Sequence, residues 1–107
     1  MHHIEIIHNP FIVETQFTIN GYPPAEGCKL TSFRQSRLQA WIERLFGELD
    51  ALFNGDSDFH VTFTGVESDY LDVQEAAEVA ITRGMRVALE WVPTKPTETR
   101  LDQMREL

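Results

Sequence analysis

The most constraining feature of this sequence is a stripe of apolar residues between positions 38 and 53. Its members recur at helical spacing and fill an arc of about 140° on a helix. They are Leu38, Trp41, Ile42, Leu45, Phe46, Leu49, Leu52 and Phe53. A helix with one apolar face must bury that face against another layer. Ser32 and Gln35 match a capping box that predicts the helix start, and Asn54 and Gly55 predict its end.

Two strands are predicted before this helix. Residues 4–8 are rich in β-forming side chains, and Asn9 and Pro10 end them because proline cannot donate to a β-ladder. Residues 11–19 alternate, and their apolar face would consist of Phe11, Val13, Phe17 and Ile19. Only a tight turn separates the two segments, which favours a β-hairpin. The turn-forming residues 20–24 predict a loop after it.

A strand–helix–strand unit is predicted after the first helix. Residues 59–64 alternate apolar and polar side chains, and residues 85–92 do the same. Between them, Ser68 predicts the N-cap of a helix that Gly84 would close. The buried stripe of this helix would consist of Tyr70, Val73, Ala77, Ala80 and Ile81. Such a unit is expected to form a right-handed crossover between parallel strands.

These elements predict an α/β (α+β) two-layer sandwich with element order ββαβαβ and a mixed sheet of about four strands. Because the strands after the first have one apolar face, both helices should cover that face. The domain would span residues 1–92, followed by a proline-rich linker at 93–97. Residues 98–107 would start another helix, but its apolar pattern stops without a helix-ending signal. We therefore expect the chain to belong to a larger protein with a missing downstream region.

Composition and charge exclude several classes of protein. The chain has 107 residues, which fit one domain. Nine basic against seventeen acidic residues, a net charge of −8, argue against binding nucleic acid or an anionic membrane surface. No apolar run approaches the roughly 20 residues of a membrane span, and the N-terminus lacks a signal-peptide pattern. A single cysteine forms no internal disulfide, so nothing indicates an oxidising compartment and we expect a cytoplasmic protein. Because no membrane span is predicted, we also expect no direct membrane insertion.

No pattern of catalytic or cofactor-binding residues is present. The six glycines form neither G-x-x-x-x-G-K-[ST] nor G-x-G-x-x-G, so nothing predicts a nucleotide site. Cys28 beside Lys29 has the setting of an activated thiol, but a small loop residue is the simpler interpretation. We assign no catalytic residues and no cofactor, and an enzyme is the third-ranked of three interpretations.

Metal-binding patterns are equally weak, and no metal ligands are assigned. His2, His3, His8 and His60 lack the spacing of a zinc site. With a free amine, Met1, His2 and His3 would offer square-planar nitrogen donors for Cu(II) or Ni(II). Residues 54–58 are rich in oxygen ligands but lack the ordered spacing of a calcium loop, and so predict a helix-to-strand turn.

Two polar surfaces are candidates for binding. The carboxylates of Glu67, Asp69, Asp72, Glu75 and Glu78 predict a solvated helix face or, alternatively, a docking face for a basic partner. The polar sheet face is more informative. It would consist of Glu14, Gln16, Thr18, His60, Thr62, Thr64, Arg86 and Glu90. Such a face can simply meet water, or it can seat a second domain or a ligand.

One stretch of the chain resembles a known family. Residues 61–77 read V-T-F-T-G-V-E-S-D-Y-L-D-V-Q-E-A-A. They resemble the F-x-G-x-x-x-D-Y-x-D-x-x-E-A pattern of domains that precede the GTPase in some bacterial dynamin-like proteins. Residues 7–15, I-H-N-P-F-I-V-E-T, are similar to the start of such proteins. The family's catalytic residues belong to a P-loop that this chain lacks, so no site residue is carried over. The resemblance implies an accessory domain whose downstream neighbour hydrolyses GTP.

The sequence therefore predicts a non-catalytic accessory or interaction domain at the N-terminus of a larger cytoplasmic protein. Its partner would be a downstream domain of the same chain or another protein. The alternative is a complete small protein that binds a ligand or a partner through the open polar sheet face.

Overall fold

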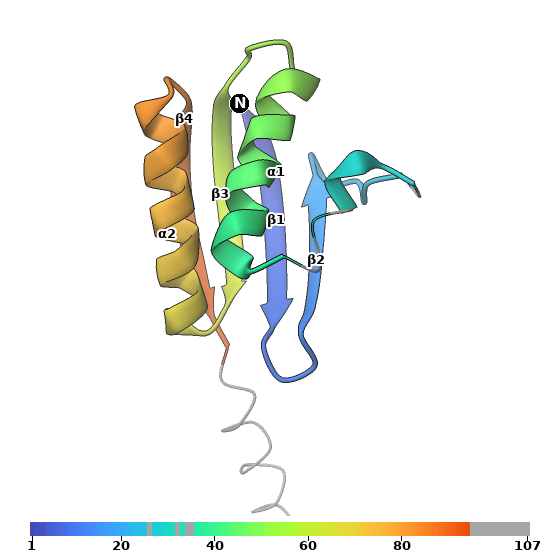
Figure 1. The fold of residues 1–107 in the computed structure, drawn as a ribbon, viewed down its shortest axis with the longest axis vertical. Coiled ribbons are helices and arrows are strands. Elements are labelled where there is room, and N and C mark those ends of the chain that lie inside the picture. The colour runs from blue at the N-terminus through green and yellow to red at the C-terminus, as the bar shows by residue number, and fades with distance from the viewer. Residues whose placement is uncertain (26, 32, 34–35, 95–107) are drawn as a thin grey trace, which may run out of the picture.

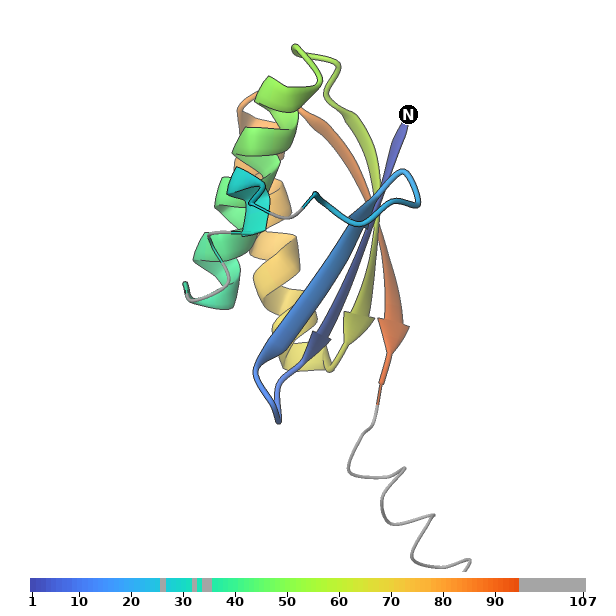
Figure 2. The same cartoon turned by 90° about the vertical axis from the view of Figure 1, so that its right-hand side faces the viewer.

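The computed structural model describes residues 1–25, 27–31, 33 and 36–94. Within them, a four-stranded sheet carries two helices on one of its faces (Figures 1 and 2). The predicted two-layer α/β sandwich is confirmed. The predicted helix at 98–107 and most of the predicted linker lie outside the described residues.

The sheet has the strand order β2-β1-β3-β4. Strand β1 (His2–Asn9) pairs antiparallel with β2 (Glu14–Ile19), which forms the predicted hairpin. On its other side β1 pairs parallel with β3 (Asp58–Gly65), and β3 pairs parallel with β4 (Arg86–Pro93). The sheet is therefore mixed, and the strand that comes first in the chain lies inside it.

Both helices lie against the same face of this sheet (Figure 2). Helix α1 (Leu38–Leu52) follows a short 3-10 helix, η1 (Lys29–Thr31), on the way from β2 to β3. Helix α2 (Glu67–Thr82) joins β3 to β4, so the predicted crossover between parallel strands is present. Among the described residues, neither of these helices has the length and apolarity needed to cross a bilayer.

The hydrophobic core lies between the sheet and the helices. The apolar stripe of α1 provides its largest part, and alternate residues of β1 and β3 pack in the same core from the sheet side. These residues are Trp41, Ile42, Leu45, Phe46 and Leu49 from α1, Ile4 and Ile6 from β1, and Phe59, Val61 and Phe63 from β3. Each is at most 1% exposed. Leu52, the stripe residue in the last turn of α1, is instead exposed at the end of the helix layer.

The predicted strand at residues 11–19 is too long. Strand β2 begins only at Glu14, and Phe11 and Val13 belong to the turn rather than to the apolar sheet face. The cause is local, because Val13 has φ of 49°, which lies in the left-handed region and cannot continue a strand. The prediction was wrong because the aromatic and β-branched residues of this segment are types that favour strands.

The predicted helix starts also need correction. Ser32 and Gln35 lie outside the described residues, and α1 begins at Leu38 without a side-chain cap. Helix α2 has Val66 as its N-cap, so Ser68 lies inside the first turn instead of capping it. Its buried residues are Val73, Ala76, Ala77 and Ala80. Ile81 is 50% exposed, because it projects about 90° from the centre of that buried arc.

Candidate functional site

The sheet face opposite the helices carries all eight residues predicted to form an interaction face. Side chains alternate along each strand, and in every case the neighbours of these residues point into the core or toward it. Strand β2 contributes Glu14, Gln16 and Thr18, β3 contributes His60, Thr62 and Thr64, and β4 contributes Arg86 and Glu90. They therefore share one surface, which we call the open face.

The central strand adds residues to the open face that the sequence interpretation missed. Strand β1 places His3, Glu5 and Ile7 there, opposite to buried Ile4 and Ile6. Three isoleucines within five residues concealed the alternation, and only the pairing with β2 and β3 reveals it. The register aligns Glu5 with Thr18 on one side and with Thr62 on the other.

The register divides the open face into a polar row and a partly apolar row. The polar row runs Thr18, Glu5, Thr62, Glu90 across the four strands. The next row, nearer the carboxyl ends of the parallel strands, runs Gln16, Ile7, Thr64, Val92. Ile7 and Val92 are each 42% exposed, so apolar surface appears at this end of the face.

A loose polar cluster occupies the middle of the open face. The rings of His3 and His60 meet edge to face with centroids 5.6 Å apart. His60 Nε2 lies 3.8 Å from Glu90 Oε2, and the Thr62 hydroxyl donates to the same oxygen at 3.4 Å. These distances are long and Glu90 is 61% exposed, so the contacts contribute little to stability. The cluster has the chemistry of a solvated surface.

A tighter polar cluster lies at the carboxyl ends of β1 and β3. His8 Nδ1 lies 2.6 Å from the Thr15 hydroxyl, and His8 Nε2 lies 3.7 Å from Asp69 Oδ2 in the first turn of α2. Asp69 Oδ2 is buried without a hydrogen-bond partner among the described residues. Burial raises the pKa of the Asp69 carboxyl; His8 opposes this and Asp72 adds to it. The expectation that the carboxylates of α2 all face solvent is therefore wrong for Asp69.

The Thr15, His8 and Asp69 side chains are the residue types of a hydrolytic triad, but their geometry fits a different role. Thr15 is 9% exposed, and the His8 side chain is also 9% exposed, so a substrate cannot reach the hydroxyl. The contact between His8 and Asp69 is longer than a hydrogen bond. The cluster instead joins the hairpin to the start of α2.

The turn between β1 and β2 exposes three large apolar side chains in succession. Phe11 and Ile12 are each 64% exposed and Val13 is 77% exposed. We call these three residues the apolar tip. The turn is held by Asn9, whose side-chain oxygen accepts a hydrogen bond from the Phe11 N–H at 2.9 Å. Val13 adopts its left-handed conformation at the end of this turn, an unusual choice for a β-branched residue.

Other exposed apolar residues belong to the same end of the domain as the apolar tip. The β1–β2 turn, the start of α2 and the end of β4 all lie at that end (Figure 1). Ile7 and Val92 are the exposed apolar residues near the ends of β1 and β4, and Leu71 is exposed in the second turn of α2. Six of the ten exposed large apolar side chains among the described residues thus belong to this end, and the other four are Met1, Tyr22, Leu52 and Ile81.

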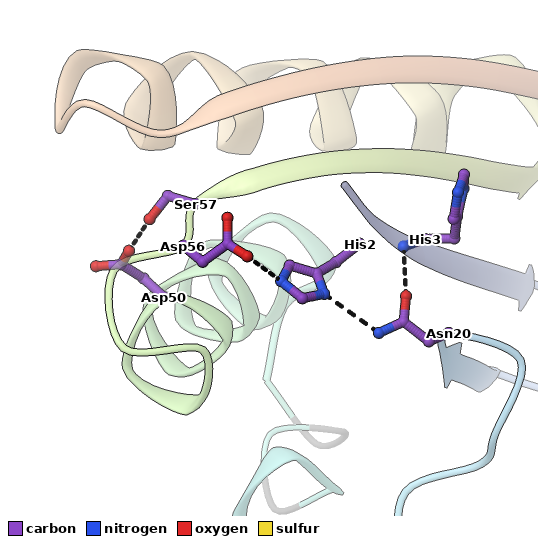
Figure 3. Close-up of polar contacts among 6 residues, drawn as sticks. All are labelled: His2, His3, Asn20, Asp50, Asp56 and Ser57. Carbon is purple, nitrogen blue, oxygen red and sulfur yellow. Dashed lines mark hydrogen bonds and ion pairs between the residues drawn. The ribbon is translucent and has the colours of Figure 1, made fainter.

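His2 fixes the opposite end of β1, as Figure 3 shows. Its Nε2 lies 2.9 Å from Asp56 Oδ2, and its Nδ1 lies 3.2 Å from the side-chain nitrogen of Asn20. The ring stacks on Phe53 with centroids 3.7 Å apart. Asn20 also accepts the His3 N–H at 2.8 Å through its Oδ1. A neutral imidazole with its proton on Nε2 satisfies all of these contacts, because Asn20 can then donate to Nδ1.

This arrangement bears on the metal-binding patterns. An N-terminal copper or nickel site would need the backbone nitrogen of His3, which here is bonded to Asn20. In the part of the chain that the structure describes, no three His, Cys, Asp or Glu side chains converge on a possible metal position. His2, His3, His8 and His60 are distributed over three separate contacts.

The remaining candidate residues have structural surroundings. Cys28 is half-buried and packs against the core in the turn before η1, where its carbonyl accepts hydrogen bonds from Thr31. The oxygen-rich residues 54–58 form the turn into β3. There the Ser57 hydroxyl donates to the Asp50 carboxylate and Asp56 contacts His2, so these oxygens take part in internal contacts (Figure 3).

No family model matches the chain, and no curated protein or solved structure matches it significantly. The resemblance to accessory domains of dynamin-like proteins stays a prediction.

Proposed function

We propose that this chain is a non-catalytic interaction domain that binds a protein partner through its apolar tip. The observation that carries the proposal is the exposure of Phe11, Ile12 and Val13, at 64%, 64% and 77%. Soluble domains rarely present three consecutive large apolar side chains to water without a binding role. The Thr15, His8 and Asp69 cluster is too enclosed for a substrate to reach the Thr15 hydroxyl.

The energetics of the tip favour a bound state. Burying one such side chain fully is worth about 1.5–3 kcal/mol, so three of them provide on the order of 5 kcal/mol against an apolar partner. The left-handed Val13 stores roughly 1–3 kcal/mol of strain. A strained and exposed apolar turn is thus a cost to the isolated domain that a partner's contacts can offset.

The position of the tip suits an accessory domain of a larger cytoplasmic protein. Strand β4 ends at the same end of the domain, so a neighbour joined after Thr94 would start at the end that carries the tip (Figure 1). An intramolecular partner of this kind fits the proposed role at the N-terminus of a dynamin-like GTPase. The net charge of −8 supports a protein partner over nucleic acid.

Site-specific photo-crosslinking tests the proposal. A photoreactive phenylalanine analogue replaces Phe11, and in a matched variant it replaces Leu52, which is 54% exposed at the end of α1. In cells that express the full reading frame, position 11 should give one defined crosslinked species or an intramolecular crosslink, and position 52 should not. Equal yields at both positions, or none at position 11, would contradict an interface at the tip.

A further inference from the structure

We infer that the outer edge of β2 is a second binding site, which takes an extended peptide segment carrying a basic side chain. The peptide adds to the sheet as a fifth strand. This site begins at Glu14, directly after the apolar tip, but it does not depend on the function proposed above. Its test uses a peptide and a different readout, so the two ideas can fail independently.

The free backbone groups of β2 follow from its pairing with β1. The Asn20 N–H donates to the His3 carbonyl at 2.7 Å, which makes Asn20 and His3 a hydrogen-bonded pair. In an antiparallel ladder such pairs recur at every second residue. Gln16 and Thr18 therefore face β1, while Thr15 and Phe17 direct their N–H and C=O groups outward. Among the described residues, none bonds to these four outward groups.

The chain itself begins to fill this edge and then leaves it. The Ile19 N–H donates to the Tyr22 carbonyl at 2.8 Å, and the Tyr22 N–H donates back at 3.0 Å. This single antiparallel bridge is the start of a strand on the outer side of β2. Pro23 and Pro24 follow, and they have no N–H with which to continue the ladder. The edge beside Phe17 and Thr15 is left open by this departure.

A groove runs along the open part of the edge. Its volume is about 510 Å³, and it is lined by Gln16 and Phe17 on the β2 side and by Pro24 and Thr31 on the other. Ligand sites in proteins commonly measure about 300–1,000 Å³, so the groove can take several residues of an extended chain. Strand addition of this kind takes affinity from backbone hydrogen bonds and specificity from alternate side chains.

Charge defines the chemistry of the peptide. Glu14 is the charged side chain among the described residues that line the groove, and it is exposed. Its Oε1 accepts a hydrogen bond from Gln16 Nε2 at 3.0 Å, which holds the carboxylate beside the strand. A lysine or arginine of the added strand would complete this site. Apart from Glu14, strand β2 lacks the charged side chains, proline or bulge with which edges are usually protected.

Amide exchange of the chain of residues 1–107, measured by NMR, tests the inference. The probe is a capped synthetic peptide of seven residues that alternates valine and lysine, and a second peptide replaces each lysine by glutamate. The lysine peptide should slow exchange at the Thr15 and Phe17 amides by about tenfold or more, because both become hydrogen-bonded. The Gln16 amide, which already faces β1, is the internal control.

A charge reversal tests the role of Glu14. Glu14→Lys should weaken binding of the lysine peptide by about fivefold, because an attraction becomes a repulsion. The same change should strengthen binding of the glutamate peptide, because there a repulsion becomes an attraction. Glu78→Lys makes the same change of net charge on an exposed position of α2 and should leave both affinities unchanged.

Three results would overturn the inference. One is the absence of protection at Thr15 and Phe17 with millimolar lysine peptide. Another is protection of Val87 and Leu89 instead, whose outward groups lie on the opposite sheet edge. The third is protection at Thr15 and Phe17 that grows with protein concentration without peptide, which would assign the edge to a second copy of the chain.

Discussion

A single methyl group at Gly65, the last residue of β3, should destabilise the domain. A Cβ at this position would lie 2.7 and 2.8 Å from two ring carbons of Phe63 and 3.4 Å from the His8 carbonyl oxygen. Phe63 is completely buried, so its ring cannot move into solvent to make room. The end of the strand would have to shift, and there the Gly65 carbonyl accepts bonds from Trp91 Nε1 and the Thr94 N–H, each at 3.0 Å.

The expected size of this effect follows from three contributions. Overpacking a filled core costs about 1–3 kcal/mol. Weakening two hydrogen bonds adds roughly 1 kcal/mol. The lower chain entropy of unfolded alanine returns about 0.4–1 kcal/mol. Gly65→Ala should therefore reduce the free energy of unfolding by about 2 kcal/mol, a large share of a small domain's stability.

Gly47 in the middle of α1 provides the matched control. A Cβ at Gly47 would meet no atom within 4 Å, and glycine inside a helix costs roughly 0.5–1 kcal/mol relative to alanine. Gly47→Ala should therefore raise the free energy of unfolding. Urea titrations followed by tryptophan fluorescence measure both variants, and the slopes should not change. If Gly65→Ala is as stable as the parent chain, the contact with Phe63 does not constrain this position.

Three further predictions concern the core, the buried carboxyl and nucleotides. Leu45→Ala should cost about 2–5 kcal/mol because Leu45 is fully buried, whereas Leu71→Ala on the exposed side of α2 should cost far less; equal urea midpoints would show that α1 is wrongly oriented. Burial raises the pKa of the Asp69 carboxyl in the folded state. The contribution of the protonated carboxyl to the free energy of unfolding is therefore complete below the unfolded pKa near 3.9, and it is lost as the pH rises through the folded pKa. Asp69→Asn should therefore gain stability over the parent chain as the pH rises from about 4 to 7, and a constant difference would contradict this. Residues 1–107 should show no micromolar affinity for GTP or ATP by calorimetry, because no glycine-rich phosphate loop is present, and measurable binding would overturn that expectation.

The elements with a strong local period could be predicted from the sequence. The apolar stripe from Trp41 to Leu49 predicts helix α1, and the alternation of Phe59, Val61 and Phe63 predicts β3. The order of the strands across the sheet has no such local signal. The predicted strand at residues 11–13 was wrong for a related reason. The composition favoured a strand, but the left-handed conformation of Val13 does not allow one.

The candidate surfaces were predictable to the same extent. Alternation alone placed eight polar residues on one face, but their rows and the contribution of β1 depend on register between strands distant in sequence. The contact of His8 with Asp69 joins β1 to α2, and no spacing of residues along the chain predicts it. The groove beside β2 depends on the path that the chain takes after Pro23, which turn chemistry alone does not determine.

The parallel arrangement of β1, β3 and β4 has a mechanical consequence. The start of β1 and the end of β4 lie at opposite ends of the sheet (Figure 1). Tension applied between Met1 and Thr94 would therefore act along the strands and would have to slide β1 past β3 and β3 past β4. The hydrogen bonds of each ladder would then share the force instead of opening one after another. A domain with this geometry should extend only under high force along that axis, so it can bear tension between its two ends while staying folded.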